Sequence, residues 1–442
     1  MIRILLLTAA LQSPQDTARL TVSIAIDRAL ASHPSAAFAR ASVDVAAADE
    51  RQARASWLPM VSLDGAVNKF QQPMIVYPLH RLDLRNPPVF DTDLSQVSLG
   101  ASYTVFDFGA RSSRTRAAAL QRDAADASLG AAEQQLIART LVSYLRVLTA
   151  RGVLDAEDQR VAALAAEAQR ARDRFAAGKT ARLDTLRAAA ELAVVTADRV
   201  ASATNVELAE QDLARLMGVS VAAVHGAALS SVHLGRLGAE VSPDRLAMVA
   251  RAGSANADVQ AAARRADAAA ASVGAARAGR LPQFQATTAI VDRSNVTGRW
   301  LSEWQVGVGM TWPLFTGGAR TSAISRAEAS SRAAQEQHRL TRLTAEQQVD
   351  EARAAFDASR ARVAALDAAV QQASEVARIT ALARDVGDGT QTDYLIAEAS
   401  LFRARSGLVQ ARHAAVAARV ELARVLGELN RAWIVNSLET QP

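Results

Sequence analysis

Residues 102–111 read SYTVFDFGAR and join two different sequence patterns. The residues before Gly109 alternate between apolar and small polar side chains, which is typical of a strand with one apolar face. Directly after Gly109 the sequence becomes rich in alanine, a strong helix former. Glycine suits such a junction because it adopts backbone angles that other residues avoid. The stretch therefore predicts a strand that passes directly into a helix.

The same junction occurs a second time, where residues 310–320 read MTWPLFTGGAR. Phe106 and Gly109 recur as Phe315 and Gly318, each 209 residues later in the chain. Repeats of this size are whole folding units rather than short solenoid repeats. The sequence therefore predicts one duplicated unit, in which two strands lead into a long helical hairpin.

The 442-residue chain is predicted to begin with a signal peptide at 1–13. The first repeat spans 14–218 and contains a helix, two strands within 60–107 and a hairpin at 110–218, and a connector follows at 219–242. The second repeat spans 243–427 and contains a helix, two strands within 283–314 and a hairpin at 319–427, and a tail follows at 428–442. Arg3, a short apolar run and small residues indicate the signal peptide. In the second repeat we expect one unbroken helix from Pro243 to Ala278. The connector and the tail are expected at the same level of the molecule.

The predicted hairpins contain very long helices. No strong helix breaker occurs between Arg111 and Gly178, so this helix would be roughly 100 Å long at about 1.5 Å per residue. A coiled-coil seam is indicated by apolar residues that recur every seven positions in the second repeat, namely Val349, Phe356, Val363 and Val370.

Composition excludes several functional classes. The chain has no cysteine, so disulfides, thiol catalysis and a lipid-bearing N-terminal cysteine are excluded. The net charge is only +5, and charges of both signs are interspersed as on solvated helix faces, not gathered as in a nucleic-acid patch. Gly178-Lys179-Thr180 is not a phosphate-binding loop, because Asp173 stands where that motif needs glycine. We predict no enzymatic activity, no cofactor, no metal site and no nucleic-acid partner.

The strand pairs point to a membrane. No apolar run approaches the roughly 20 residues that a membrane-spanning helix needs. Each strand instead has one apolar face and one face of small polar residues. In a soluble protein the polar face would meet water, whereas in a membrane barrel the apolar face meets lipid and the polar face lines a channel. The residues predicted to face lipid are Val97, Leu99, Val306 and Val308.

Four strands are too few to close a membrane barrel, since the smallest have about eight. An open sheet edge in lipid leaves backbone groups unpaired. The barrel must therefore be shared among chains, and the strand count alone allows two, three or more.

The chain resembles TolC-like outer membrane efflux proteins over nearly its whole length. The resemblance rests on the duplicated strand and hairpin unit, on the junction at Leu314–Arg320, and on the hairpin turns at 178–184 and 387–393. It implies a mainly helical fold with a β-barrel portion: a homotrimer with a 12-stranded barrel in the outer membrane and a coiled-coil tunnel in the periplasm. The function implied is a passive exit duct of a tripartite efflux or type I secretion system. The implied partners are outer-membrane lipid, a periplasmic adaptor protein and, indirectly, an inner-membrane pump.

The resemblance also implies functional residues at the hairpin ends. The adaptor would dock on a tip made of Gly178, Lys179, Thr180, Gly387, Asp388, Gly389 and Thr390. The periplasmic gate would use the acids Asp184 and Asp393. A second acid of the family's gate is replaced here by Ile396, and Gly389 stands where a basic residue is expected.

Basic residues near the two gate acids are candidate partners for them, namely Lys179, Arg182 and Arg384. A simpler alternative is that Asp184 and Asp393 only start their helices favourably, at the positive end of the helix dipole.

Two other functions remain open at this point. The chain could be a periplasmic adaptor with a coiled-coil hairpin, or an elongated soluble scaffold. An adaptor has one hairpin within a β-domain, whereas this chain predicts two hairpins and amphipathic strand pairs. The transported substrate is not readable from the sequence.

Overall fold

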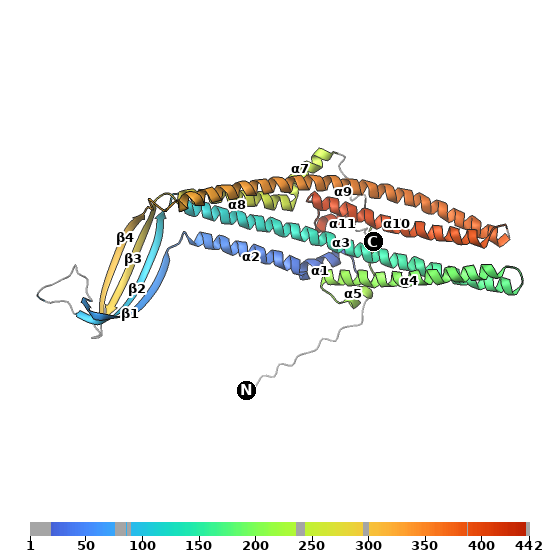
Figure 1. Ribbon diagram of the computed structural model, residues 1–442, viewed down its shortest axis with the longest axis horizontal. Coiled ribbons are helices and arrows are strands. Elements are labelled where there is room, and N and C mark those ends of the chain that lie inside the picture. The colour runs from blue at the N-terminus through green and yellow to red at the C-terminus, as the bar shows by residue number, and fades with distance from the viewer. Residues whose placement is uncertain are drawn as a thin grey trace, which may run out of the picture. The chain divides into compact units, whose positions relative to one another are not determined.

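The computed structural model describes residues 19–75, 85, 90–235, 244–294, 300–386 and 388–438. The predicted signal peptide at 1–13 and Gly387 of the predicted tip lie outside the described residues. The chain divides into two compact units, whose helices and strands are labelled in Figure 1. The first unit comprises Met1–Arg40, Ser128–Val259 and Arg342–Pro442, and the second comprises Ala41–Ala127 and Gln260–Thr341.

The two halves of the chain contain the same elements in the same order. The first half has α1 (Val22–Ser32), α2 (Pro34–Ala55), β1 (Met60–Ile75), β2 (Phe90–Phe106), α3 (Ala110–Ala176) and α4 (Arg182–Met217). The second half has α7 (Arg245–Ala255), α8 (Ala257–Ala278), β3 (Gln283–Ser294), β4 (Trp300–Thr311), α9 (Ala319–Val386) and α10 (Gln391–Val425). Two short helices follow the hairpins, α5 (Val221–His225) and α11 (Arg431–Leu438). The matching lengths extend to α1 and α7, with 11 residues each, and to α3 and α9, with 67 and 68.

The helix predicted from Pro243 to Ala278 is broken at Asn256, so that prediction is wrong. The Asn256 backbone is extended, and its side-chain oxygen accepts a hydrogen bond of 3.0 Å from the backbone N–H of Asp258. Its amide nitrogen donates to the carbonyl oxygen of Val425 at 3.0 Å. Asparagine side chains compete in this way with helical backbone bonds and favour a helix start. His33 separates α1 from α2 at the equivalent place in the first half.

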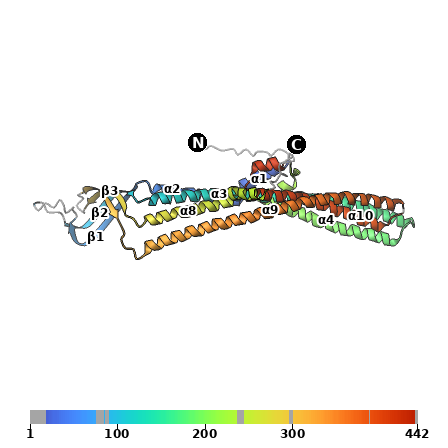
Figure 2. The ribbon, with the colours of Figure 1, turned by 90° about the horizontal axis from the view of Figure 1, so that it is seen from above.

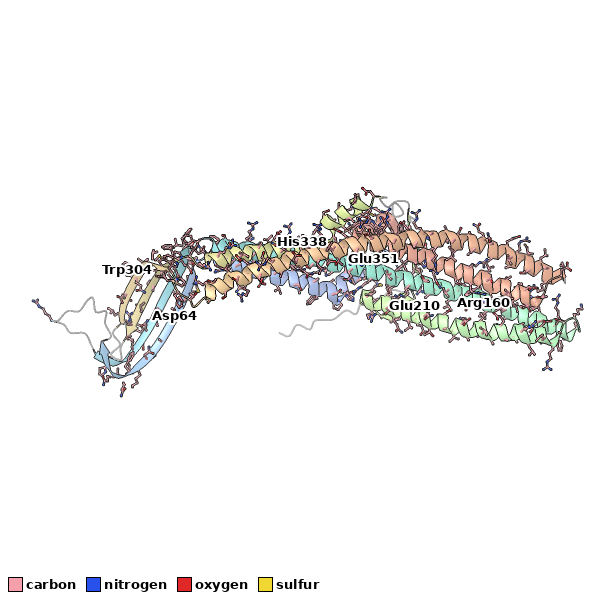
Figure 3. The ribbon with its side chains drawn as sticks, turned by 45° about the horizontal axis from the view of Figure 1, so that its top comes forward. Asp64, Arg160, Glu210, Trp304, His338 and Glu351 are labelled. Carbon is pink, nitrogen blue, oxygen red and sulfur yellow. The ribbon has the colours of Figure 1, made fainter. Side chains whose placement is uncertain are left out.

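The sheet belongs to the second unit and has four antiparallel strands in the order β1-β2-β3-β4. Its register aligns one residue of each strand in an apolar row, Leu63, Leu99, Ile290 and Trp304. These side chains are between 49% and 75% exposed. The next row lies on the opposite face and consists of Asp64, Ser98, Val291 and Glu303. Figure 3 labels Trp304 and Asp64, one from each face.

Each strand-to-helix junction uses two consecutive residues with left-handed backbone angles. Phe108 and Gly109 have φ of 52° and 84°, and Gly317 and Gly318 have 58° and 84°. This geometry favours glycine, so the second junction is less strained than the first. At the first junction Arg111 offsets part of this cost, because its guanidinium packs 4.5 Å from the Trp57 ring and also bonds the Asp107 carboxylate at 3.2 Å. Of the predicted junction residues, Phe106 and Phe315 are exposed.

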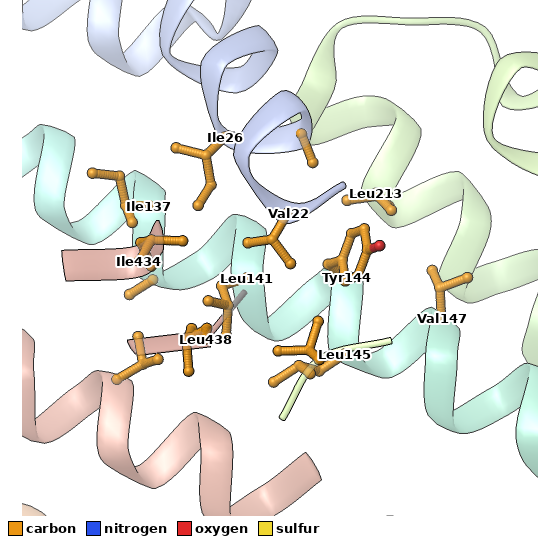
Figure 4. Close-up of a cluster of buried hydrophobic side chains, with 14 of the residues drawn as sticks. Val22, Ile26, Ile137, Leu141, Tyr144, Leu145, Val147, Leu213, Ile434 and Leu438 are labelled. Atoms are coloured by element: carbon orange, nitrogen blue, oxygen red, sulfur yellow. The ribbon is translucent and has the colours of Figure 1, made fainter. Parts of the chain in front are cut away.

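The first unit has its main core where α3 passes α1, α4 and α11. Figure 4 shows side chains of these helices converging, among them Val22, Leu141 and Ile434. The buried hydroxyl of Tyr144 lies 2.7 Å and 2.9 Å from the carbonyl oxygens of Leu20 and Ser230. Helix α11 lies beside α1 (Figure 2). The core therefore joins segments that lie far apart in the sequence.

A second core of the first unit lies along α9, where the predicted seam residues Val349 and Phe356 are fully buried. They pack against α7 and α10.

Within the part of the chain that the structure describes, no helix has both the length and the apolar content that crossing a membrane requires. The same residues contain no group of three or more His, Asp or Glu side chains placed to hold a metal ion.

Candidate functional site at the hairpin ends

The first hairpin turns at Gly178, whose φ of 70° lies in the left-handed region. The N–H of Lys179 donates to the carbonyl oxygen of Arg174 at 2.8 Å and closes the end of α3. A Cβ atom built on Gly178 would have no heavy atom within 4 Å, and the Lys179 side chain is exposed. The turn thus presents a small, open surface with one positive charge.

The second hairpin turns more tightly. The N–H groups of Asp388 and Gly389 both donate to the carbonyl oxygen of Ala383, at 2.9 Å and 3.0 Å. A Cβ atom on Gly389 would lie 3.0 Å from the backbone nitrogen of Arg384, which is closer than side chains normally approach. This close approach is a physical reason for glycine where the resemblance led us to expect a basic residue.

Asp184 and Asp393 each lie in the first turn of a helix, α4 and α10. The hydroxyl of Thr180 donates to Asp184 at 2.6 Å, and that of Thr390 donates to Asp393 at 2.6 Å. Neither carboxylate forms an ion pair with any described residue. Within one chain the two acids therefore stabilise helix starts, and their role in a gate stays a prediction.

The basic residue Arg384 pairs instead with Glu167, a residue that the sequence analysis did not single out. The Arg384 guanidinium on α9 donates to the Glu167 carboxylate on α3 at 2.9 Å, and the two side chains are only 9% and 5% exposed. The guanidinium also lies 4.1 Å from the ring centre of Tyr394 on α10. We call Glu167, Arg384 and Tyr394 the interhairpin clamp, because it joins the two hairpins.

Two further groups support the clamp. Arg170 donates a second charged hydrogen bond to Glu167 at 2.6 Å. Burial raises the pKa of the Tyr394 phenol, and the charge of Glu398 raises it further, so the ring stays neutral. A neutral, buried ring attracts a cation to its face, and such contacts are worth roughly 0.5–2 kcal/mol. The clamp therefore contains a buried ion pair: the Glu167 carboxylate accepts hydrogen bonds from two arginines, and the Arg384 guanidinium packs on a neutral ring.

A separate polar contact joins the hairpins nearer their ends. Arg187 on α4 donates to the hydroxyl of Thr392 on α10 at 3.2 Å. Both side chains are solvent-accessible, so this contact is weaker than the clamp.

The sheet supplies the other predicted site residues. Val306 and Val308 are 71% and 74% exposed, and Val97 and Leu99 are also exposed. Val97 pairs with Asp292 of β3, so it lies where the apolar face gives way to polar residues. The structure of one chain does not contain the lipid, and the lipid-facing role of these residues stays a prediction.

Known proteins share this arrangement. The family model described as outer membrane efflux protein matches residues 25–219 and 249–428, which is most of both halves. The chain belongs to the outer membrane efflux protein family. It is 25% identical to the outer membrane protein TolC of Vibrio cholerae over 319 residues, covering 71% of this chain and 72% of TolC.

Two solved structures have the same fold. The outer membrane protein VceC of Vibrio cholerae is 24% identical, with a TM-score of 0.76 over 92% of this chain and 96% of VceC. A membrane protein from Pseudomonas aeruginosa is 25% identical, with a TM-score of 0.79 over 92% of this chain and 93% of that one.

The family match confirms the predicted TolC-like relationship, the mainly helical fold with an antiparallel sheet, and the efflux function in the outer membrane. The protein is an outer membrane efflux protein, and its family is one of ducts rather than enzymes.

We predict that Arg384→Met loosens the hairpin ends. The change leaves the buried Glu167 carboxylate with Arg170 as its remaining charged partner, and such a loss costs about 1–3 kcal/mol. Amide hydrogen exchange in the last three turns of α9 should become about ten- to a hundredfold faster.

The matched control is Arg378→Met, which removes an exposed arginine of the same helix whose one partner among the described residues is Glu375, three residues before it. This variant should exchange almost as the wild type does. Equal exchange rates in the two variants would show that the clamp does not hold the hairpins together.

Proposed function

We propose that three copies of this chain form one passive duct, through which solutes received from an inner-membrane pump leave the cell. The observation that carries the proposal is the sheet, which combines an exposed apolar face with two open edges. The duct itself would be passive, and the pump would supply the energy.

The open edges require partners. Among the described strands, which follow the order β1-β2-β3-β4, β1 and β4 each pair on one side only. In lipid the free N–H and C=O groups of an edge strand would have no water to bond, at a cost of several kcal/mol per group. Pairing β4 of one copy with β1 of the next removes both edges. Three copies supply the 12 strands that the resemblance to TolC-like proteins implies, whereas one copy cannot reach the minimum of about eight.

The two faces of the sheet suit lipid and water respectively. The row that contains Trp304 is apolar in all four strands, and the adjacent row contains Asp64 and Glu303. A closed barrel with the apolar rows outside would put the carboxylates in a water-filled channel.

The facing of the strands is testable with two neighbouring residues. Val308→Arg would place a charge in lipid, at a depth-dependent cost of about 2–4 kcal/mol at the bilayer midplane, and should lower the yield of assembled trimer in outer membranes. Gly307→Arg places the same side chain on the other face, where a Cβ atom has no neighbour within 4 Å. Its trimer yield should stay close to that of the wild type. Equal losses in the two variants would contradict this facing.

The hairpin ends would dock the periplasmic adaptor. The open space at Gly178 and the exposed Lys179 support this, because a partner can reach the turn without displacing any neighbour. A photoreactive residue at Lys179 should crosslink to the adaptor in cells, and one at the exposed Arg405 of α10 should not. Crosslinks of equal yield from both positions would argue against a tip-specific contact.

The hairpin ends would also form the closed gate. In a trimer, three copies of Asp393 would surround the axis, and rings of carboxylates attract cations. Asp393 is exposed in the single chain, and among the described residues its carboxylate accepts a hydrogen bond from Thr390 at its own helix start. The interhairpin clamp would keep the ends together while the gate is shut.

We predict that Asp393→Asn lowers the cation preference of the channel in planar bilayers. The control is Asp357→Asn, which removes an exposed carboxylate from the middle of α9. Reversal potentials measured in a salt gradient report the selectivity of each variant. If the two variants shift it equally, Asp393 acts only as a helix-start residue.

The two alternative functions, a periplasmic adaptor and an elongated soluble scaffold, explain fewer features of the structure. A periplasmic adaptor or a soluble scaffold leaves the apolar face of the sheet without a partner. The cargo stays open among small molecules, metals and proteins, because a wide duct need not hold one ligand tightly.

A further inference from the structure

A hollow of about 680 Å³ lies in the first unit beside the last turns of α4 and α10. Its wall is strongly basic. Four arginines line it, namely Arg139, Arg146, Arg215 and Arg424, and they face only two carboxylates, Asp212 and Glu421. None of these residues belongs to the hairpin ends or to the proposed gate.

The ion pairs inside the hollow leave positive charge uncompensated. Arg146 and Arg215 share the single carboxylate of Asp212, at 3.4 Å and 2.8 Å. Arg424 is paired with Glu421 through two hydrogen bonds, of 2.9 Å and 2.6 Å. Arg139 has no ion pair or hydrogen bond with any residue that the structure describes. The wall therefore carries two more positive than negative groups.

A buried hydroxyl in the same wall lacks a partner. Ser143 is only 5% exposed, and its side-chain oxygen makes no hydrogen bond within the described chain. It lies on α3 four residues after Arg139 and three before Arg146, so the three residues share one helix face. Leaving a buried hydroxyl unpaired is costly, which points to a ligand or ordered water at this position.

We propose that this hollow binds a divalent oxyanion of the phosphate type, free or as the charged group of a water-soluble solute. Guanidinium groups present two parallel N–H donors that match the oxygens of phosphate. Arg139 and the half-compensated Arg146 and Arg215 supply the charge, and Ser143 supplies a neutral donor. Arg215 and Arg424 also lie in the last turns of their helices, where they offset the negative ends of the dipoles.

The wall favours a soluble anion over a lipid. Of the twelve residues that line it, three are apolar, namely Ala138, Val142 and Leu216, and the other nine are polar or charged. The site rests on the fold of one chain and does not depend on the proposed trimer, adaptor or gate.

The test is a titration of the purified full-length protein with inorganic phosphate in detergent, at constant ionic strength, followed by calorimetry. The wild type should bind phosphate. Arg139→Gln should weaken binding about tenfold, the loss that one charge-assisted hydrogen bond corresponds to. Ser143→Ala keeps every charge and should weaken binding about threefold.

The control is Arg405→Gln, which removes an exposed arginine of α10 that does not line the hollow. It should bind as the wild type does, and all variants should keep the helical circular dichroism of the wild type. Absence of phosphate binding by the wild type would overturn the proposal, as would equal affinity in Arg139→Gln and wild type. Binding of dihexanoyl phosphatidic acid without binding of inorganic phosphate would assign the site to a lipid headgroup instead.

Discussion

A backbone N–H or C=O group at the edge of a sheet must find a partner when water is absent, and this requirement governs the second unit. The sheet ends at β1 and β4 with open edges, while its apolar row from Leu63 to Trp304 is exposed. Either feature alone would be a liability for a soluble protein, because open edges and apolar patches promote aggregation. Together they support the proposal that the sheet is one third of a closed surface, completed by two other copies of the chain.

The long helices place a second requirement on the first unit. A helix of 67 residues has no core of its own and is stabilised by the face that it buries. Near the hairpin ends the seam is narrow and built from alanine, as in the cluster of Ala168, Ala171 and Ala188. Such small contacts bury little apolar area, so breaking a buried charged contact such as the interhairpin clamp costs a larger share of the stability there. Ends held by a few polar contacts are also the part of a helix pair that opens most readily.

Local signals in the sequence were sufficient for most of the fold. The glycines at 109 and 318 predicted both junctions because a left-handed backbone excludes most other residues, and the repeat of 209 residues predicted equal hairpins. The break at Asn256 was missed because asparagine is tolerated inside helices, and its bond to Val425 joins residues far apart in the sequence. Glu167 was missed for the same reason: its partner Arg384 lies on another hairpin, and only the packing of α3 against α9 brings them together. The sequence carries one signal for Glu167, which lies on the same helix face as the buried residues Leu164, Ala168 and Ala171. An acid on an apolar helix face needs a partner.

The central claim is that β4 of one copy pairs with β1 of the next, and the lack of natural cysteine makes it directly measurable. Ser62 and Gln305 lie in one row on the same face of the sheet, at its two opposite edges. Closing a barrel staggers the register between β4 and the next β1, so cysteine pairs combine each residue of this face in β1, from 60 to 68, with each residue of this face in β4, from 301 to 311. Each double variant can be treated in outer membranes with a short bismaleimide and analysed by denaturing electrophoresis. Closed pairing of three copies predicts a discrete covalent trimer as the largest product, while each single variant stays monomeric. Monomer alone from every pair, or a ladder that continues beyond three chains, would contradict the account.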